Sequence, residues 1–179
     1  MKIPRLALAI FLLVLATGCA TVSVQYDYDT SADFSAMESY AWLKVPSGQE
    51  LDDITIRRVK SAVDSQLALK GYTISEEDPD FTIAVHGKIQ DKVDVVDWGY
   101  RYGRYDRYYS GYGGSRRVDT YEYEEGTLLI DFVDAESGDL VWRGSGTGVL
   151  DPSASPEKRE KGVNDAVAKI LAKFPPPAK

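Results

Sequence analysis

The sequence predicts an α+β domain, in which a mostly antiparallel sheet of about six strands carries two helices packed on one face. Two segments, 51–70 and 156–174, have apolar residues at helical spacing. Residues 80–96 alternate apolar and polar side chains, which is typical of a strand with one buried and one solvated face. Residues 126–134 and 139–150 form a further strand pair, joined by a short turn that contains Gly138.

Three short strands complete the predicted sheet. Val22, Val24 and Tyr26 alternate with polar residues, as in a half-buried strand. A turn-rich stretch separates this strand from a second one at 40–43, and a third is expected at 72–74. With the three long strands, the count reaches six.

Both predicted helices have a one-sided apolar stripe. The stripes consist of Ile56, Val59, Val63 and Leu67 in the first helix and of Val163, Val167, Ile170 and Phe174 in the second. Asp52 or Asp53 can cap the first helix, where a carboxylate also favours the positive end of the helix dipole. Ser155 caps the second helix, with Pro156 in its first turn. Each helix is therefore expected to lie on the sheet through its stripe.

Two of the long strands allow their faces to be assigned. The core face of strand 80–96 is expected to hold Phe81, Ile83, Val85, Ile89, Val93 and Val95. In strand 139–150, Gly144, Gly146 and Gly148 share one face with Trp142. A row of glycines leaves a shallow groove that another element can approach closely. The second helix is the expected occupant of that groove.

Residues 1–18 predict a cleaved signal peptide. Lys2 and Arg5 form a positive head, and an uncharged apolar run of eleven residues follows at 6–16. Eleven helical residues rise about 16 Å, which is too little to cross a hydrocarbon core of about 30 Å. This segment is therefore not expected to be part of the fold.

The end of the signal peptide predicts a lipid anchor at Cys19. Ala16-Thr17-Gly18-Cys19 resembles a bacterial lipobox, in which the Cys is lipidated and the peptide is cut ahead of it, although Leu15 stands one place earlier than that pattern prefers. An ordinary signal peptide with a buried Cys near its end is the alternative. Ala20 follows Cys19, and no Asp of the kind that resembles an inner-membrane retention signal stands there. We therefore expect a protein of the cell envelope, anchored in the outer membrane and facing the periplasm, with one domain over 19–176.

Composition excludes several other classes of protein. One Cys cannot form an intramolecular disulfide, and one Cys with one His cannot build a His/Cys zinc site of three or four ligands. A net charge of −7 argues against a nucleic-acid-binding protein, which needs Lys and Arg to neutralise phosphates. Neither a metal nor a cofactor is predicted.

An ordered set of short blocks resembles a known family. The blocks are Asp33-Phe34-Ser35, Ser39-Tyr40-Ala41-Trp42, Lys70-Gly71-Tyr72, Pro79-Asp80-Phe81, the segments 125–131 and 140–144, and the segment 169–176. Together they resemble, over nearly the whole mature chain, the bacterial lipoprotein family catalogued as domain of unknown function 4136. The resemblance implies a small envelope lipoprotein domain with no established activity and no catalytic residues to carry over.

The segment at 97–120 is the best candidate for binding. The candidate surface consists of Trp98, Tyr100, Arg101, Tyr102, Arg104, Tyr105, Arg107, Tyr108, Tyr109 and Tyr112. From 98 to 117, five Arg and one Asp give a local charge of +4. Aromatic rings interleaved with guanidinium groups can stack on flat ligands and bind anions, so a glycan, a lipid headgroup or an envelope protein could bind there. A flexible Tyr/Gly/Arg-rich loop explains the same composition.

No catalytic residue is predicted. His86 lies on the solvated face of its strand without a positioned partner of the kind that a general base needs. Acidic and serine residues at 27–38 match several positions of a calcium loop, but Ala32 stands where the loop needs a glycine. The sequence thus favours a non-catalytic envelope lipoprotein that acts as a structural or interaction module. A glycan-binding or small-ligand module is the alternative, and a hydrolase is the least favoured reading.

Overall fold

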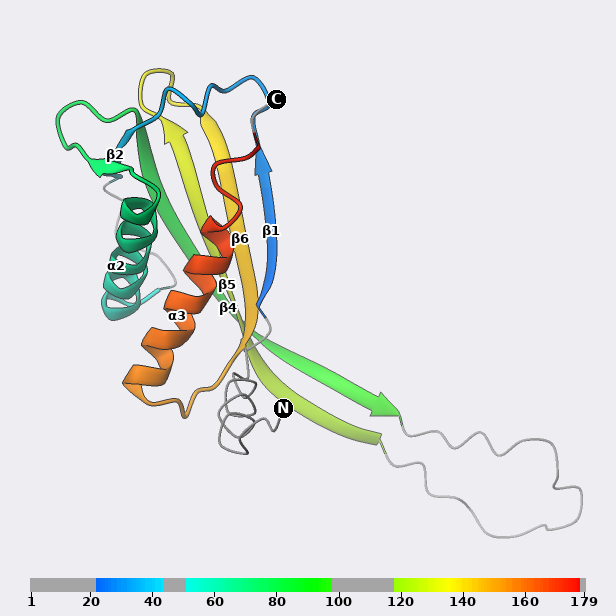
Figure 1. The fold of residues 1–179 in the computed structure, drawn as a ribbon. Coiled ribbons are helices and arrows are strands. Elements are labelled where there is room, and N and C mark those ends of the chain that lie inside the picture. Colours follow the sequence, from blue (N-terminus) through cyan, green and yellow to red (C-terminus); the bar gives the residue numbers. More distant parts are fainter. Residues whose placement is uncertain (1–21, 44–50, 98–117, 178–179) are drawn as a thin grey trace, which may run out of the picture.

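The computed structural model of the chain describes residues 22–43, 51–97 and 118–177. The elements, in chain order, are β1 (Ser23–Tyr28), β2 (Ser39–Trp42), α2 (Asp53–Leu69), β3 (Thr73–Ile74), β4 (Phe81–Asp97), β5 (Val118–Asp134), β6 (Leu140–Leu150) and α3 (Pro156–Leu171). Figure 1 shows two layers, a twisted sheet and a layer of two helices that covers one of its faces. The predicted α+β class and the one-sided helix layer are confirmed.

The sheet is mixed, which corrects the prediction of a mostly antiparallel one. Its six strands follow the order β1-β6-β5-β4-β2-β3. The pairs β1·β6, β5·β6 and β4·β5 are antiparallel, whereas β2 runs parallel to both β3 and β4. Helix α2 supplies the crossover that two adjacent parallel strands require, because it lies between β2 and β3 in the chain. Apolar alternation identifies the faces of a strand, but not the direction of its neighbours.

Asp80 fastens the parallel pair β2·β4. One of its carboxylate oxygens accepts hydrogen bonds from the backbone N–H groups of Glu38, at 2.9 Å, and Ser39, at 2.8 Å, and from the Ser39 hydroxyl at 2.8 Å. These bonds, the one from Glu38 first, hold the pKa of the Asp80 carboxyl below its usual value. The residue that precedes β4 therefore fixes the start of β2.

Both helices begin at the predicted caps. Asp52 accepts hydrogen bonds from the backbone N–H groups of Ile54 and Thr55, and Ser155 accepts one from Lys158. The second helix was predicted over 156–174, but α3 ends at Leu171. Phe174, which lies beyond that end, still belongs to the core.

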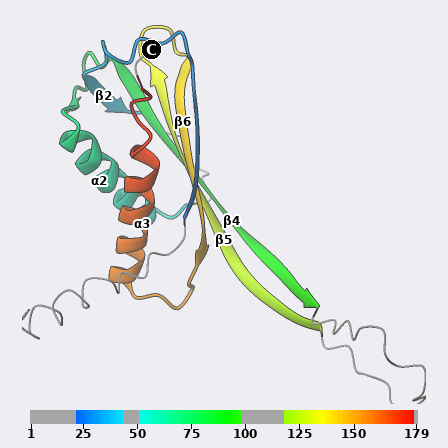
Figure 2. The ribbon, with the colours of Figure 1, turned by 45° about the vertical axis from the view of Figure 1, so that its right-hand side comes forward.

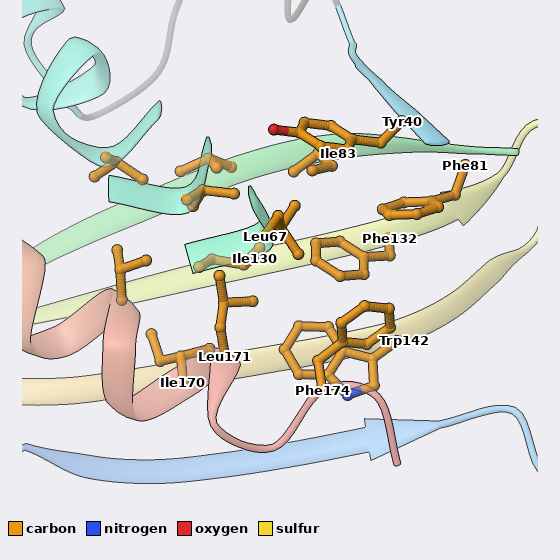
Figure 3. Packing of buried hydrophobic residues seen from close by; sticks show 14 of the residues in the cluster. Tyr40, Leu67, Phe81, Ile83, Ile130, Phe132, Trp142, Ile170, Leu171 and Phe174 are labelled. Atoms are coloured by element: carbon orange, nitrogen blue, oxygen red, sulfur yellow. The ribbon is translucent and has the colours of Figure 1, made fainter. Parts of the chain in front are cut away.

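The core lies between the sheet and the two helices, and aromatic side chains fill one end of it (Figure 3). Phe174 follows α3 and places its ring 4.5 Å from the Phe132 ring and 5.3 Å from the Trp142 ring, measured between centroids. Phe81 lies 4.9 Å from Phe132 on the other side. All four side chains are fully buried. The end of the chain is thereby tied to the three central strands by aromatic packing.

Helix α3 lies against the glycines of β6. A Cβ atom at Gly144 would collide with the side chains of Trp142 and Ile170, and one at Gly146 would come within 2.9 Å of Ile170 Cδ1. The predicted contact between the glycine row and the second helix is confirmed at these two positions. Gly148 faces Val22 instead.

Strands β4 and β5 continue beyond the helices as an arm, which we define as residues 89–97 of β4 and 118–126 of β5. β6 pairs with residues 124–126 at the base of the arm, and beyond them the arm is two-stranded. Figures 1 and 2 show the arm projecting away from the two-layer body. Ile89 and Val93, which the alternation pattern placed in the core, lie on the arm and are 49% and 59% exposed. That prediction is wrong, because neither helix extends over this part of the sheet.

The arm also shortens the predicted loop at 97–120. Asp97 pairs with Val118, and residues 119 and 120 pair with 96 and 95. Both ends of the predicted loop are therefore strand. Residues 98–117 lie outside the described residues.

A substitution in the glycine row tests the close packing of α3. We expect Gly144→Ala to lower the free energy of unfolding by about 1–3 kcal/mol, since the new methyl group overpacks a filled site. Gly162→Ala, within α3 and with no atom near its Cβ position, serves as the matched control and should raise stability by about 0.5–1 kcal/mol. Urea denaturation of the two variants measures both effects. Equal effects of the same sign would show that α3 does not rest on Gly144.

Candidate functional site

The residues predicted to carry function fall outside the described residues. Cys19 precedes β1, and the ten candidate binding residues within 98–112 follow the end of β4. The structure does describe the two places where these segments join the fold. A candidate site can be sought at those two places and at the clusters of charged residues on the body.

The predicted anchor and the arm join the body at the same end of the sheet. β1 begins at Ser23, four residues after Cys19, and Ser23 pairs with Thr147 near the end of β6. β6 ends at Leu150, which pairs with Glu124 at the base of the arm. Figure 1 shows the start of β1 and the base of the arm together at the lower end of the body. Four residues of chain separate Cys19 from Ser23 in the sequence, and four residues span at most about 14 Å.

The arm is strongly acidic. It carries seven acidic residues and one Lys: Asp91, Asp94, Asp97, Asp119, Glu122, Glu124, Glu125 and Lys92. Lys92 Nζ lies 3.5 Å from a carboxylate oxygen of Glu125 on the paired strand. The arm thus leads to a segment with a charge of +4 in a chain whose net charge is −7. The projecting acidic arm was not predicted, because the alternation pattern assigned Ile89, Val93 and Val95 of this strand to the core.

An open groove of about 640 Å³ runs along the base of the arm. Its lining residues are Asp91, Lys92, Val93, Glu122, Tyr123, Glu124, Leu150, Asp151 and Pro152. Asp151 is already engaged, because hydrogen bonds from Lys158 and then from Ser153 lower the pKa of its carboxyl to about 2. The groove therefore offers an acidic surface with apolar side chains in it, rather than an enclosed pocket.

A buried carboxylate lies on the helix-free face of the sheet. Asp131 is 4% exposed, and Arg143 on the neighbouring strand donates two hydrogen bonds to it, from Nε to Oδ1 and from Nη2 to Oδ2, both at 2.6 Å. These bonds raise the pKa of the Arg143 guanidinium, and burial partly opposes them. His86 Nε2 lies 3.8 Å from Oδ2, beyond hydrogen-bond distance. Because Arg143 occupies both carboxylate oxygens, this cluster is a structural ion pair.

A second buried network ties α2 to β2. Asp64 accepts hydrogen bonds from the Tyr40 hydroxyl at 2.8 Å and from Trp42 Nε1 at 2.9 Å, and Lys60 Nζ lies 4.8 Å from the centre of the Trp42 ring. Burial first, and the hydrogen bond to Asp64 second, raise the pKa of the Tyr40 hydroxyl. The network joins helix α2 to strand β2 and thereby stabilises the body.

The acidic turn after β1 forms local hydrogen bonds. Asp29 accepts from the backbone N–H of Ser31 at 2.7 Å, and Asp33 accepts from that of Ser35 at 3.0 Å. Within residues 22–43, 51–97 and 118–177, no three His, Cys, Asp or Glu side chains gather into a possible metal site. In the same part of the chain, no helix has the length and apolar character needed to cross a bilayer.

A family model described as "Domain of unknown function (DUF4136)" matches residues 24–176. The match covers β1 through α3 and therefore the whole described fold. No curated protein matches the chain.

Solved structures resemble the fold at low sequence identity. A PDZ domain protein from Parabacteroides distasonis has a TM-score of 0.59 and 14% identity, with 98% of this chain and 41% of that chain covered. This chain therefore spans about two fifths of that protein's length. The PelC dodecamer from Paraburkholderia phytofirmans has a TM-score of 0.48 and 13% identity, with 85% of this chain and 96% of that chain covered. At these identities, the first likeness is one of fold alone.

The structural role assigned to Asp131 can be tested on its two neighbours. Arg143→Met leaves the buried carboxylate unpaired and should lower the free energy of unfolding by about 1–3 kcal/mol at pH 7. His86→Ala should change it by less than about 0.5 kcal/mol, because the imidazole is half-exposed and beyond hydrogen-bond distance. Chemical denaturation compares the two variants. A loss with His86→Ala as large as that with Arg143→Met would show that the imidazole is part of the Asp131 cluster.

Proposed function

Because the chain belongs to the DUF4136 family, whose function is unknown, its role has to be inferred from its own residues, and we propose a non-catalytic, lipid-anchored module of the bacterial cell envelope. In this proposal an acylated Cys19 holds the domain at the outer membrane on its periplasmic side. The domain then acts as a structural or interaction module, and the arm presents the Tyr/Arg-rich segment to an envelope partner.

One observation carries the proposal: the chain enters β1 only four residues after Cys19, at the end of the body where the arm also begins. A tether of at most about 14 Å keeps that end of a lipidated domain close to the bilayer. Two or more acyl chains on one Cys would make the attachment durable. The base of the arm is then close to the membrane as well.

The charged clusters of the body support a non-catalytic role. Both oxygens of the Asp131 carboxylate accept hydrogen bonds from Arg143, and Asp64 Oδ1 accepts from Tyr40 and Trp42. A general base needs a free lone pair and a positioned partner near a place where substrate can sit. Neither Asp131 nor Asp64 lines the groove at the base of the arm, where a substrate could sit.

The length of the arm favours the alternative function, a glycan or small-ligand binding module. Six paired residues in each strand, 92–97 and 118–123, extend beyond the end of β6 toward the 98–117 segment, which corresponds to about 20 Å at strand spacing. A binding segment carried at that distance can contact a polymer or a surface without interference from the body. Stacking of tyrosine and arginine side chains on sugar rings is the chemistry that this alternative uses.

Lipidation is tested by mass spectrometry of the protein purified from membranes. We expect cleavage before Cys19 and a diacylglyceryl group on its sulfur, with or without a further amide-linked acyl chain. The Cys19→Ser variant should move from the membrane fraction to the soluble fraction, because only the anchor holds it there. An unmodified thiol on Cys19, or a Cys19→Ser variant that stays in the membrane fraction, would contradict the proposal.

The role of the tyrosine segment is tested by two matched sets of substitutions. Replacing Tyr102, Tyr105, Tyr108 and Tyr109 by Ala should lower the recovery of a crosslinked envelope partner, or the binding of envelope glycans, by roughly tenfold or more, as expected from the loss of one or two stacked rings. Replacing the same residues by Phe keeps the rings and should retain most of the binding. Recovery that is equal for all three proteins would remove the segment from the binding function. Binding of glycan but not of protein would favour the alternative role.

A further inference from the structure

Along the arm, the outer edge of β4 pairs with none of the other strands in the described part of the chain. β2 pairs with β4 only at residues 81–83, whereas β4 continues to Asp97. From residue 89 to residue 97, no described strand other than β5 pairs with β4. Beyond the end of β6, the arm consists of β4 and β5 alone. Two-stranded ribbons are marginally stable in water, and an open strand edge is a template for a further strand.

The backbone groups of Val93 point to this open edge. The backbone N–H of Leu43, just after β2, donates to the Ile83 carbonyl at 2.9 Å, so the backbone groups of Ile83 face the outer edge. Successive residues of a strand present their N–H and C=O groups to alternate edges, and β4 pairs with β5 from residue 81 to residue 97 without a register shift. Every second residue after Ile83 therefore faces the same way, and Val93 is one of them.

We propose that the arm binds the arm of a second copy of this chain. The two β4 strands pair antiparallel through their outer edges, about a two-fold axis at Val93, and join two ribbons into one four-stranded sheet. In this arrangement Val93 lies opposite Val93 of the second copy, and Lys92 lies opposite Asp94. The inference is independent of lipidation at Cys19 and of the tyrosine segment.

The charges of Lys92 and Asp94 favour the register with the axis at Val93 over other registers of the two β4 strands. An axis at Val93 brings Lys92 of each copy opposite Asp94 of the other, which gives two pairs of opposite charge. These are non-hydrogen-bonded pairs, in which the Cα atoms approach to about 4.5 Å and the side chains are closest. An axis at Asp91 would place two carboxylates opposite each other, and an axis at Ile89 would pair Lys88 with Gln90. Only the axis at Val93 combines an apolar centre with two opposite-charge pairs.

Burial of Val93 favours association of the two arms, whereas repulsion between their acidic side chains opposes it. Val93 is 59% exposed, and pairing would cover it with the same side chain of the second copy. The acidic surplus of the two arms opposes association. At 0.15 M salt, however, repulsion is screened beyond about 8 Å, whereas Lys92 and Asp94 would be in contact. We therefore expect a reversible dimer whose formation depends on these two side chains.

Disulfide crosslinking of the full chain in detergent tests the register directly. Val93→Cys should give a covalent dimer under mild oxidation, because directly opposite residues have Cα atoms about 5.5 Å apart, within the range of a disulfide. Ile74→Cys, on β3 and 55% exposed, is the control of similar exposure and should give no dimer above the background of the parent chain, which contains Cys19. Equal yields from the two variants would overturn the proposal. A Val93→Cys crosslink in native membranes to a different protein, without the self-dimer, would also overturn it.

A charge exchange separates specific pairing from random collision. In the Val93→Cys background, Asp94→Lys turns two opposite-charge pairs into two like-charge pairs and should lower the yield of dimer by roughly tenfold. Adding Lys92→Asp restores opposite charges across the axis and should recover at least half of the original yield. This rescue is informative because the double variant loses the contact of Lys92 with Glu125 within the arm, and simple damage to the arm would lower the yield further. Failure of the rescue would reject the register.

Discussion

The antiparallel pairing of β4 with β5 is the interaction on which the rest of the structure depends. It joins seventeen residue pairs, from Phe81 with Asp134 to Asp97 with Val118, without a register shift. At one end, the pair forms the centre of the sheet and carries the aromatic cluster around Phe132. At the other end, the same ladder leaves the body and becomes the arm. One hairpin therefore supplies both the core and the feature that projects from it.

Local patterns predict those parts of the fold that depend on near neighbours in the chain. The stripe of α2 placed Val59, Val63 and Leu67 in the core, and all three are fully buried. The caps at Asp52 and Ser155 follow from the same local chemistry. Ile89 and Val93 were misplaced because alternation shows that a strand has two faces, but does not show whether a helix covers one of them. The parallel direction of β2 relative to β3 and β4 was not predicted for a related reason. No local sequence pattern shows which strand will lie beside another.

The charged clusters were harder to predict, because each joins residues that are distant in the sequence. Asp131 meets Arg143 only through the register of β5 and β6, and Asp80 reaches back to Ser39 across the parallel pair. A sequence shows such residues as scattered surface charges. Cys19 and the tyrosine segment were identified because their signals are local, a cleavage pattern in one case and a run of unusual composition in the other. Their roles remain proposals that rest on where the described chain enters β1 and the arm.

The acidity of β5 has a consequence for how far an assembly can grow. In a pair joined through β4, the outermost strand on each side of the arm sheet is β5. Residues 118–125 of that strand carry four acidic residues and no basic one. Concentrated like charge on a terminal strand deters the addition of further strands, a common protection against fibre formation. The dimer would therefore not add further copies. The outer edge of β4 would be paired, and the acidic side chains of β5 would disfavour pairing at its outer edge.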